Sequence, residues 1–255
     1  MLYLHMRPEQ IQDAVRRNIP VLMAAGAVEY HGPHLPVGTD YLIVEAIVKK
    51  VEERCECIIM PPLPFSATMF WAGGPKDGEF DFDSDALLVY AREIFRGLVA
   101  TGFKRIYVLQ HHQGDEGLPS LTLKHAARDI IRETGISWGH EWGRLSGDQL
   151  PNPNIFGLFQ IAHVDTFSEY PSPEAQKIPI GHGSKGETQL IMSGYPDTVK
   201  MENLDTMLQQ EGSLPPWLKD SHLGTKEEGD RWIEFCVRGW VKELSRKTGE
   251  LAIYI

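Results

Sequence analysis

The chain has little cysteine, no excess of basic residues and no long apolar run, and each shortage excludes a class of protein. Its three cysteines, two of them the near neighbours Cys55 and Cys57, form neither a disulfide framework nor a zinc-finger spacing. The formal charge of -10 argues against a nucleic-acid partner, because phosphate binding requires a concentrated basic face. No stretch approaches the roughly 20 apolar residues of a membrane span, and residues 1–8 do not read as a secretory leader. We therefore expect a cytoplasmic protein, bound to neither nucleic acid nor membrane, that acts on small molecules.

What the sequence does contain is a repeated alternation of short apolar runs and amphipathic stretches, which predicts an α/β fold with a mostly parallel sheet. With 255 residues, 42% of them hydrophobic, the chain can bury a full core, and we predict one domain over residues 1–255. Strands are expected at residues 21–25, 57–60, 105–110, 136–138 and 251–255, and helices at 8–17, 40–54, 84–101, 118–134 and 226–247. The aromatic-containing region 139–186 lacks a regular pattern, and we interpret it as the wall of a pocket or an interface.

The most informative segment has the sequence EYHGPHLP, starting at Glu29, and Asp40 follows four residues after its end. It is rich in side chains that can bind metals. Glu29 and His31 point the same way in an extended chain, and the following Gly-Pro pair turns the chain so that Asp40 can fold back toward them. Asp40 also falls in the first turn of a predicted helix, capped by Thr39, where the helix dipole favours the ionised form that a metal requires.

The position of this segment favours a functional interpretation. It begins just past the carboxyl end of the strand predicted at 21–25, where the sites of open α/β sheets lie. We interpret it as half of a metal site, for one ion or for two ions that share Asp40. The alternative is a polar loop whose histidines satisfy backbone groups.

Two later segments bring further ligand-type side chains to the same region. His111 and His112 follow the strand predicted at 105–110, so two strands present such residues at one edge of the sheet. The segment from His182 to Glu187 contains glycines that allow the backbone to approach a ligand closely, and Glu187 could supply another carboxylate.

These motifs resemble those of the creatininase (creatinine amidohydrolase) family. Its first signature is similar to Glu-x-His-Gly-x-His-Leu-Pro with an Asp shortly after, which this chain matches in order and spacing at Glu29, His31, His34 and Asp40. Residues 110–115 and 182–189 occupy the places of two later motifs, similar to Asn-Gly-His-Gly-Gly-Asn and His-Ala-Gly-Glu-x-Glu-Thr-Ser. The resemblance covers about the first three-quarters of the chain and implies a three-layer α/β/α domain.

The resemblance also implies a dinuclear centre with two divalent ions per chain, for which Zn, Mn or Fe suit the mixed nitrogen and oxygen ligands. In such a centre Asp40 bridges the ions and Glu29 and His112 complete one shell. His31 and a second carboxylate, for which Glu187 is our candidate, complete the other. The implied reaction is hydrolysis of a non-peptide C–N bond in a cyclic or linear small-molecule amide. The resemblance further makes a homo-oligomer the expected assembly, with the hexamer as the family precedent.

His182 is the candidate for moving a proton to the departing nitrogen, because an imidazole with a pKa of about 6.5 can either donate or accept a proton close to neutral pH. The alternative is that His182 only orients a metal ligand. We predict that His34, His111 and Asp115 lie behind the ligands or contact the substrate.

The chain departs from the family pattern at positions that bear on the substrate. Creatininase has a glutamate ligand two residues after the motif histidine, where this chain has Gly114. It also has a tryptophan four residues before the later histidine, where Ile178 stands here. Two alternatives to a creatinine-type reaction therefore stay open: a formamide hydrolase of the same family, and a metal-containing binding or assembly protein without turnover.

Overall fold

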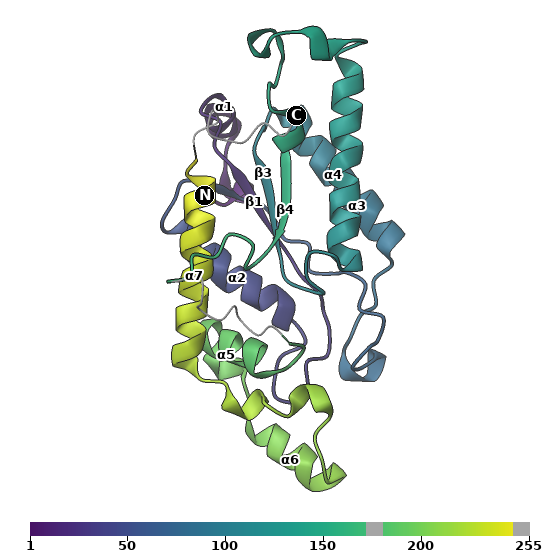
Figure 1. The fold of residues 1–255 in the computed structure, drawn as a ribbon, viewed down its shortest axis with the longest axis vertical. Coiled ribbons are helices and arrows are strands. Elements are labelled where there is room, and N and C mark those ends of the chain that lie inside the picture. The colour runs from purple at the N-terminus through teal and green to yellow at the C-terminus, as the bar shows by residue number, and fades with distance from the viewer. Residues whose placement is uncertain (172–180, 247–255) are drawn as a thin grey trace.

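The sheet of the computed structural model, which describes residues 1–171 and 181–246, has four strands in that part of the chain (Figure 1). They are β1 (Val21–Ala25), β2 (Ile58–Ile59), β3 (Ile106–Gln110) and β4 (Phe159–His163). All pairs are parallel, in the order β2-β1-β3-β4. Strand β2 pairs with one side of β1, and β3, the next strand in the chain, pairs with the other side of β1. The direction in which strands are added therefore reverses between β1 and β3. The carboxyl ends of strands at such a reversal border a crevice, which is the usual ligand site of these sheets.

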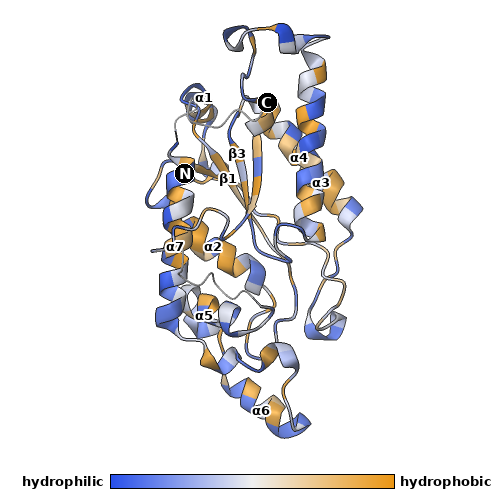
Figure 2. Cartoon of the chain, viewed as in Figure 1, coloured by the Kyte–Doolittle hydropathy of each residue, from blue (hydrophilic) through white to orange (hydrophobic). Residues whose placement is uncertain are grey.

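Helices cover both faces of the sheet, because alternate strand residues point to opposite sides. Leu22 and Leu109 pack into one core cluster together with Trp240, whereas Met23 and Val108 pack into the other. The first cluster lies under α2 (Thr39–Glu52), α5 (Lys185–Gly194) and α7 (Lys226–Leu244), and the second under α1 (Pro8–Arg16), α3 (Ser84–Thr101) and α4 (Leu118–Ser137). A further helix, α6 (Glu202–Glu211), extends from the end of the molecule nearest α5 (Figure 1). Figure 2 shows the expected result, hydrophobic strands between helices whose outer faces are hydrophilic.

The predicted fold class is confirmed, and several boundaries agree with the prediction. β1 and α3 have the predicted limits, and Gly102 ends α3 with a left-handed φ of 108°. The prediction that Thr39 caps α2 was wrong. Gly38 occupies the cap position, and Thr39 begins the helix and donates from Oγ1 to the carbonyl of Pro36 at 2.7 Å.

The strand predicted at residues 136–138 was also wrong, because α4 continues to Ser137. The predicted helix stopped at residue 134, just before Gly135, but Gly135 is buried within α4, and a Cβ there would meet Trp142 and Ile155 at ordinary contact distances of 3.5 and 3.6 Å. The fourth strand is instead β4, inside the region expected to be irregular, and α6 was not predicted. The strand expected at 251–255 lies outside the described residues. None of the described helices is long and apolar enough to cross a membrane.

Candidate metal centre

The five side chains predicted as metal ligands lie together at the carboxyl ends of β1 and β3. Glu29 and His31 come from the loop after β1, Asp40 from the first turn of α2, His112 from the residues just after β3, and Glu187 from the first turn of α5. Each is at most 5% exposed. Three carboxylates in so buried a place are costly unless positive charge offsets them.

Two glycines allow these segments to approach one another. A Cβ on Gly26, just after β1, would lie 2.7 Å from the backbone nitrogen of Tyr41, so the strand end packs directly against the start of α2 that carries Asp40. Gly183 has a left-handed φ of 58°, and a Cβ there would lie 2.7 Å from the carbonyl oxygen of His31. A larger residue at either position would separate the segments that bring the ligands together.

Two groups of ligand atoms meet at Asp40, one at each of its oxygens, and a third group brings together Glu29, His31 and His182. In the first, Nδ1 of His112 lies 3.0 Å from Asp40 Oδ2 and 3.2 Å from Glu29 Oε2. In the second, Nε2 of His31 lies 3.4 Å from Asp40 Oδ1 and 3.5 Å from Glu187 Oε2. Ligand atoms at the usual bond length around a tetrahedral zinc ion lie about 3.3 to 3.5 Å from each other. Each group therefore has the spacing of one side of a metal coordination shell.

The hydrogen bonds of the two histidines aim their free nitrogens at the carboxylates. Nδ1 of His31 lies 3.0 Å from the carbonyl oxygen of Glu29, and Nε2 of His112 lies 2.9 Å from that of Ala67. A carbonyl can only accept, so these nitrogens carry the protons when the rings are neutral, and the opposite nitrogens carry lone pairs. Three of the converging atoms are buried without a hydrogen-bond partner: Glu29 Oε2, His31 Nε2 and Asp40 Oδ2. Such a set of acceptors fits a bound cation.

The charge balance leads to the same conclusion. Among the described residues, no lysine or arginine forms an ion pair with Glu29, Asp40 or Glu187. Burial lowers the pKa of His31, but the charges of the carboxylates outweigh that effect and raise the pKa to about 10. The same opposition raises the pKa of His112 well above its ordinary value. The cluster thus attracts positive charge strongly, and divalent ions can supply it in place of protons.

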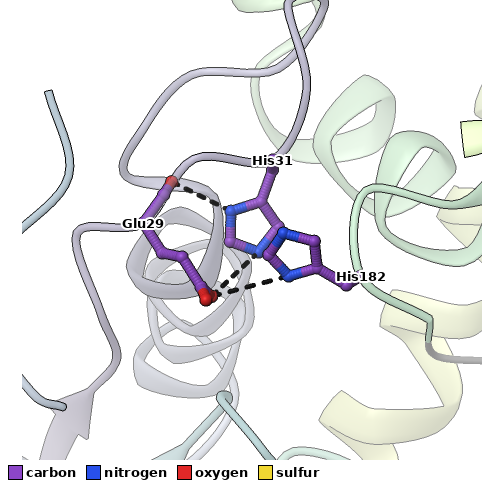
Figure 3. A group of neighbouring side chains, drawn as sticks. All are labelled: Glu29, His31 and His182. Carbon is purple, nitrogen blue, oxygen red and sulfur yellow. Dashed lines mark hydrogen bonds and ion pairs between the residues drawn. The ribbon is translucent and has the colours of Figure 1, made fainter. Parts of the chain in front are cut away.

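His182 lies beside this cluster, stacked on His31 with ring centroids 4.2 Å apart (Figure 3). Its Nε2 lies 2.7 Å from the carbonyl oxygen of Tyr30 and donates to it, so Nδ1 is the lone-pair nitrogen of the neutral ring and lies 3.5 Å from Glu29 Oε2. Burial, and next the charge of His31, lower the pKa of His182. A neutral imidazole with a fixed tautomer can accept a proton at Nδ1.

The other three predicted site residues differ in their distance from the centre. His111 contacts Glu187, with Nε2 3.0 Å from Oε1. His34 is buried one step further away, with Nε2 2.9 Å from Thr188 Oγ1. Asp115 is not among the residues that line the cavity and instead accepts from the backbone N–H of His163 at 3.3 Å.

The structure adds His163, the last residue of β4, which the sequence analysis missed. Its Nε2 lies 3.2 Å from Nδ1 of His111, and its Nδ1 lies 2.7 Å from Asp165 Oδ1. A chain of contacts therefore runs from Glu187 through two imidazoles to Asp165. The rule that placed His112 at a strand end would have found His163 had β4 been recognised as a strand.

The cluster forms the floor of a cavity of about 510 Å³, a size suited to a small organic molecule. Thr68, Met69 and Trp71 from the loop after β2 form one wall, and Gln113 and Gly114 border it after β3. Trp71 lies 5.0 Å from the ring of His182, which Trp217 also contacts at 5.0 Å. Trp138 and Trp142 pack against each other beside the core under α4 and do not line this cavity.

Comparison with known proteins shows extended similarity to one family of hydrolases. The sequence model of the creatininase family (creatinine amidohydrolase) matches residues 4–244. The creatinine amidohydrolase of Pseudomonas putida is 24% identical over 244 residues, 86% of each chain. The 3-dehydro-scyllo-inosose hydrolase of Thermotoga maritima is 23% identical over 211 residues, which are 82% of this chain and 61% of that protein. A solved structure of a mutant creatininase of Zn-Zn type has a TM-score of 0.70 at 21% identity and covers 95% of this chain and 96% of its own, which shows a common fold.

Proposed function

The chain belongs to the creatininase family, and from this membership we propose that it is a metal-dependent hydrolase that cleaves a non-peptide C–N bond in a small amide. The observation that carries the proposal is that a separate group of ligand atoms meets at each oxygen of Asp40. Two divalent ions per chain, Zn, Mn or Fe, suit this set of imidazoles and carboxylates. The Zn-Zn type of the related creatininase structure supports the same number of ions.

In this proposal Glu29, His112 and Asp40 would hold one ion, and His31, Glu187 and Asp40 would hold the other. The chemistry that such ions supply is the activation of water and the polarisation of a carbonyl group. The backbone carbonyls of Glu29 and Ala67 keep both ligand imidazoles in the tautomer that ligation requires.

Hydrolysis joins a water oxygen to the carbonyl carbon, breaks the C–N bond and transfers a proton to the departing nitrogen. His182 is the proposed carrier of this proton, because its Nδ1 faces the cluster from the side of the cavity. The bond to the carbonyl of Tyr30 fixes the ring as it takes up and releases the proton. Trp71 and Trp217 flank the ring, with centroids 5.0 Å away.

A substrate panel tests the proposal on protein loaded with Zn²⁺ or Mn²⁺. It contains creatinine, simple N-substituted formamides and a polyhydroxylated cyclic ketone, the last because of the name of the Thermotoga relative. We expect turnover of at least one amide, loss of that turnover on chelation, and recovery when the metal is returned. Hydrolysis of the ketone alone would overturn the assignment to C–N bonds. Full metal loading without any turnover would favour the binding or assembly protein.

We also propose that residues 1–255 form one domain that works in a reducing cytoplasm as a homo-oligomer. The cysteines Cys55, Cys57 and Cys236 are free, which supports the reducing compartment. Family membership supports the oligomer, with the hexamer as the precedent. Light scattering coupled to size exclusion tests the assembly, and a monomer at micromolar concentration would contradict it.

A further inference from the structure

One wall of the cavity carries unusually exposed apolar side chains. Met69 is 62% exposed and Trp71 is 58% exposed, although both line the cavity that has the ligand cluster as its floor. We call residues 68–71 the Trp71 wall. Large apolar side chains left open to solvent at a concave site indicate a contact surface for a ligand.

The backbone of the Trp71 wall is held in a conformation that its residues disfavour. Met69 and Phe70 have φ values of 64° and 49°, so two consecutive residues with full side chains adopt the left-handed region. Strain of this kind persists only where the surroundings enforce it, and it is concentrated at functional sites.

Asp81 supplies the enforcing contact from twelve residues further along the chain. Its Oδ1 accepts from the backbone N–H of Met69 at 2.9 Å and from that of Thr68 at 2.8 Å. A carboxylate oxygen that accepts from two successive backbone N–H groups stabilises the turn that brings both toward it.

The strained turn is also tied to the ligand cluster. The carbonyl of Ala67, directly before the Trp71 wall, accepts from His112, and Oγ of Ser66 donates to the carbonyl of Gly26 at 3.0 Å. The wall therefore has a fixed position relative to the residues proposed to hold the ions. In this arrangement the indole of Trp71 reaches the ring of His182.

We propose that Asp81 is a positioning residue that keeps Met69 and Phe70 in the left-handed turn, so that Trp71 forms the binding surface for the flat, uncharged part of the substrate. No lysine or arginine lines the cavity within the described part of the chain, so away from the ligand cluster no side-chain cation there matches an anionic group. The wall selects for an apolar or aromatic face beside the reacting group. This inference rests on the proposed function only for the location of that reacting group.

Binding of unreacted probes separates this inference from the question of turnover. Isothermal titration of the metal-loaded protein compares benzamide, which has a flat ring, with acetamide, which has the same amide without it. We expect Trp71→Ala to weaken benzamide binding about tenfold and acetamide binding less than about twofold, with Trp71→Phe close to the wild type.

The Asp81 variants test the positioning role. Asp81→Ala is expected to weaken benzamide binding by about three- to tenfold and to accelerate amide hydrogen exchange at Thr68 and Met69. Asp81→Asn keeps the accepting oxygen and should restore both. Asp83→Ala is the matched control, because Asp83 accepts from the backbone of Ala86 at 2.9 Å nearby but holds α3 instead of the Trp71 wall.

Three results would overturn the inference: no difference between the probes in the wild type, equal losses for both probes in Trp71→Ala, or an unchanged exchange rate at Met69 in Asp81→Ala. Absence of amide hydrolysis together with the expected binding pattern would refute the proposed function and leave this inference standing.

Discussion

Nε2 of His111 lies 3.0 Å from Oε1 of Glu187, inside a site where the related family motif has a glycine in place of this histidine. The backbone N–H of Gly183 donates to the other oxygen, Oε2, at 2.6 Å. Both carboxylate oxygens of Glu187 are therefore held in place. His163 and Asp165 support the ring of His111 from behind. The altered motif at residues 110–115 therefore adds a contact to a candidate ligand, while Gly114 stands where creatininase has a ligand.

Replacing His111 should selectively weaken the proposed ion site formed by His31, Asp40 and Glu187. We expect His111→Leu to lower the affinity for one of the two ions by about 10- to 100-fold, because groups that orient metal ligands have effects of this size. His111→Gln should lose less, since its amide can still donate to Glu187. Competition with a chromophoric chelator measures both ions. Equal affinities in wild type and His111→Leu would show that this contact does not matter for metal binding.

Removing the imidazole of His182 should impair turnover while the metal content stays at the wild-type level. We predict that His182→Ala lowers kcat by about 10²- to 10⁴-fold, the usual contribution of a positioned acid or base. The ring is not needed for either ligand group at Asp40, so both ions should remain. Steady-state kinetics and elemental analysis of the same preparation give the two values. Full turnover with both ions present would remove His182 from the proposed mechanism.

The packing of α5 on α7 should tolerate no side chain at Gly229. A Cβ there would lie 1.8 Å from the carbonyl oxygen of Gln189 in α5, the helix that also carries Glu187. We expect Gly229→Ala to lower the free energy of unfolding by about 1 to 3 kcal/mol, the usual cost of overpacking.

A matched glycine in α3 provides the control for that change. Gly97 is helical, and a Cβ there would meet nothing within 4 Å. Gly97→Ala should raise the free energy of unfolding by about 0.5 to 1 kcal/mol, because alanine loses less backbone entropy than glycine in a helix. Urea denaturation measures the free energy of unfolding of both variants. A loss of stability in both would show that the steric contact with Gln189 does not explain the effect at Gly229.

The site residues that could be predicted from sequence are those that lie close together in the chain, next to a recognisable strand or helix. Glu29, His31 and Asp40 lie within twelve residues, between a recognisable strand and helix, and His112 directly follows another strand. The structure places these side chains together, and whether they bind metal stays a prediction. Glu187 could be proposed as a ligand because it belongs to a motif.

The features that were missed depend on contacts between distant segments. β4 is a short run whose extended state comes from pairing with β3, so neither the strand nor His163 at its end was recognisable. Gly135 does not end α4, because the helix is stabilised by packing beyond that point. The turn at Met69 and Phe70 depends on Asp81, and no propensity of the two residues predicts it.

The most direct test of the central claim is the metal content per chain of wild type and Asp40→Ala, purified without chelator and shown to be folded by circular dichroism. Asp115→Ala is the matched control, because Asp115 follows β3 but does not line the cavity. We predict about two ions per chain in the wild type and the control, and loss of both in Asp40→Ala, since both ligand groups share this carboxylate. A folded wild type without metal, or an Asp40→Ala variant that keeps one ion at full affinity, would contradict the bridged centre.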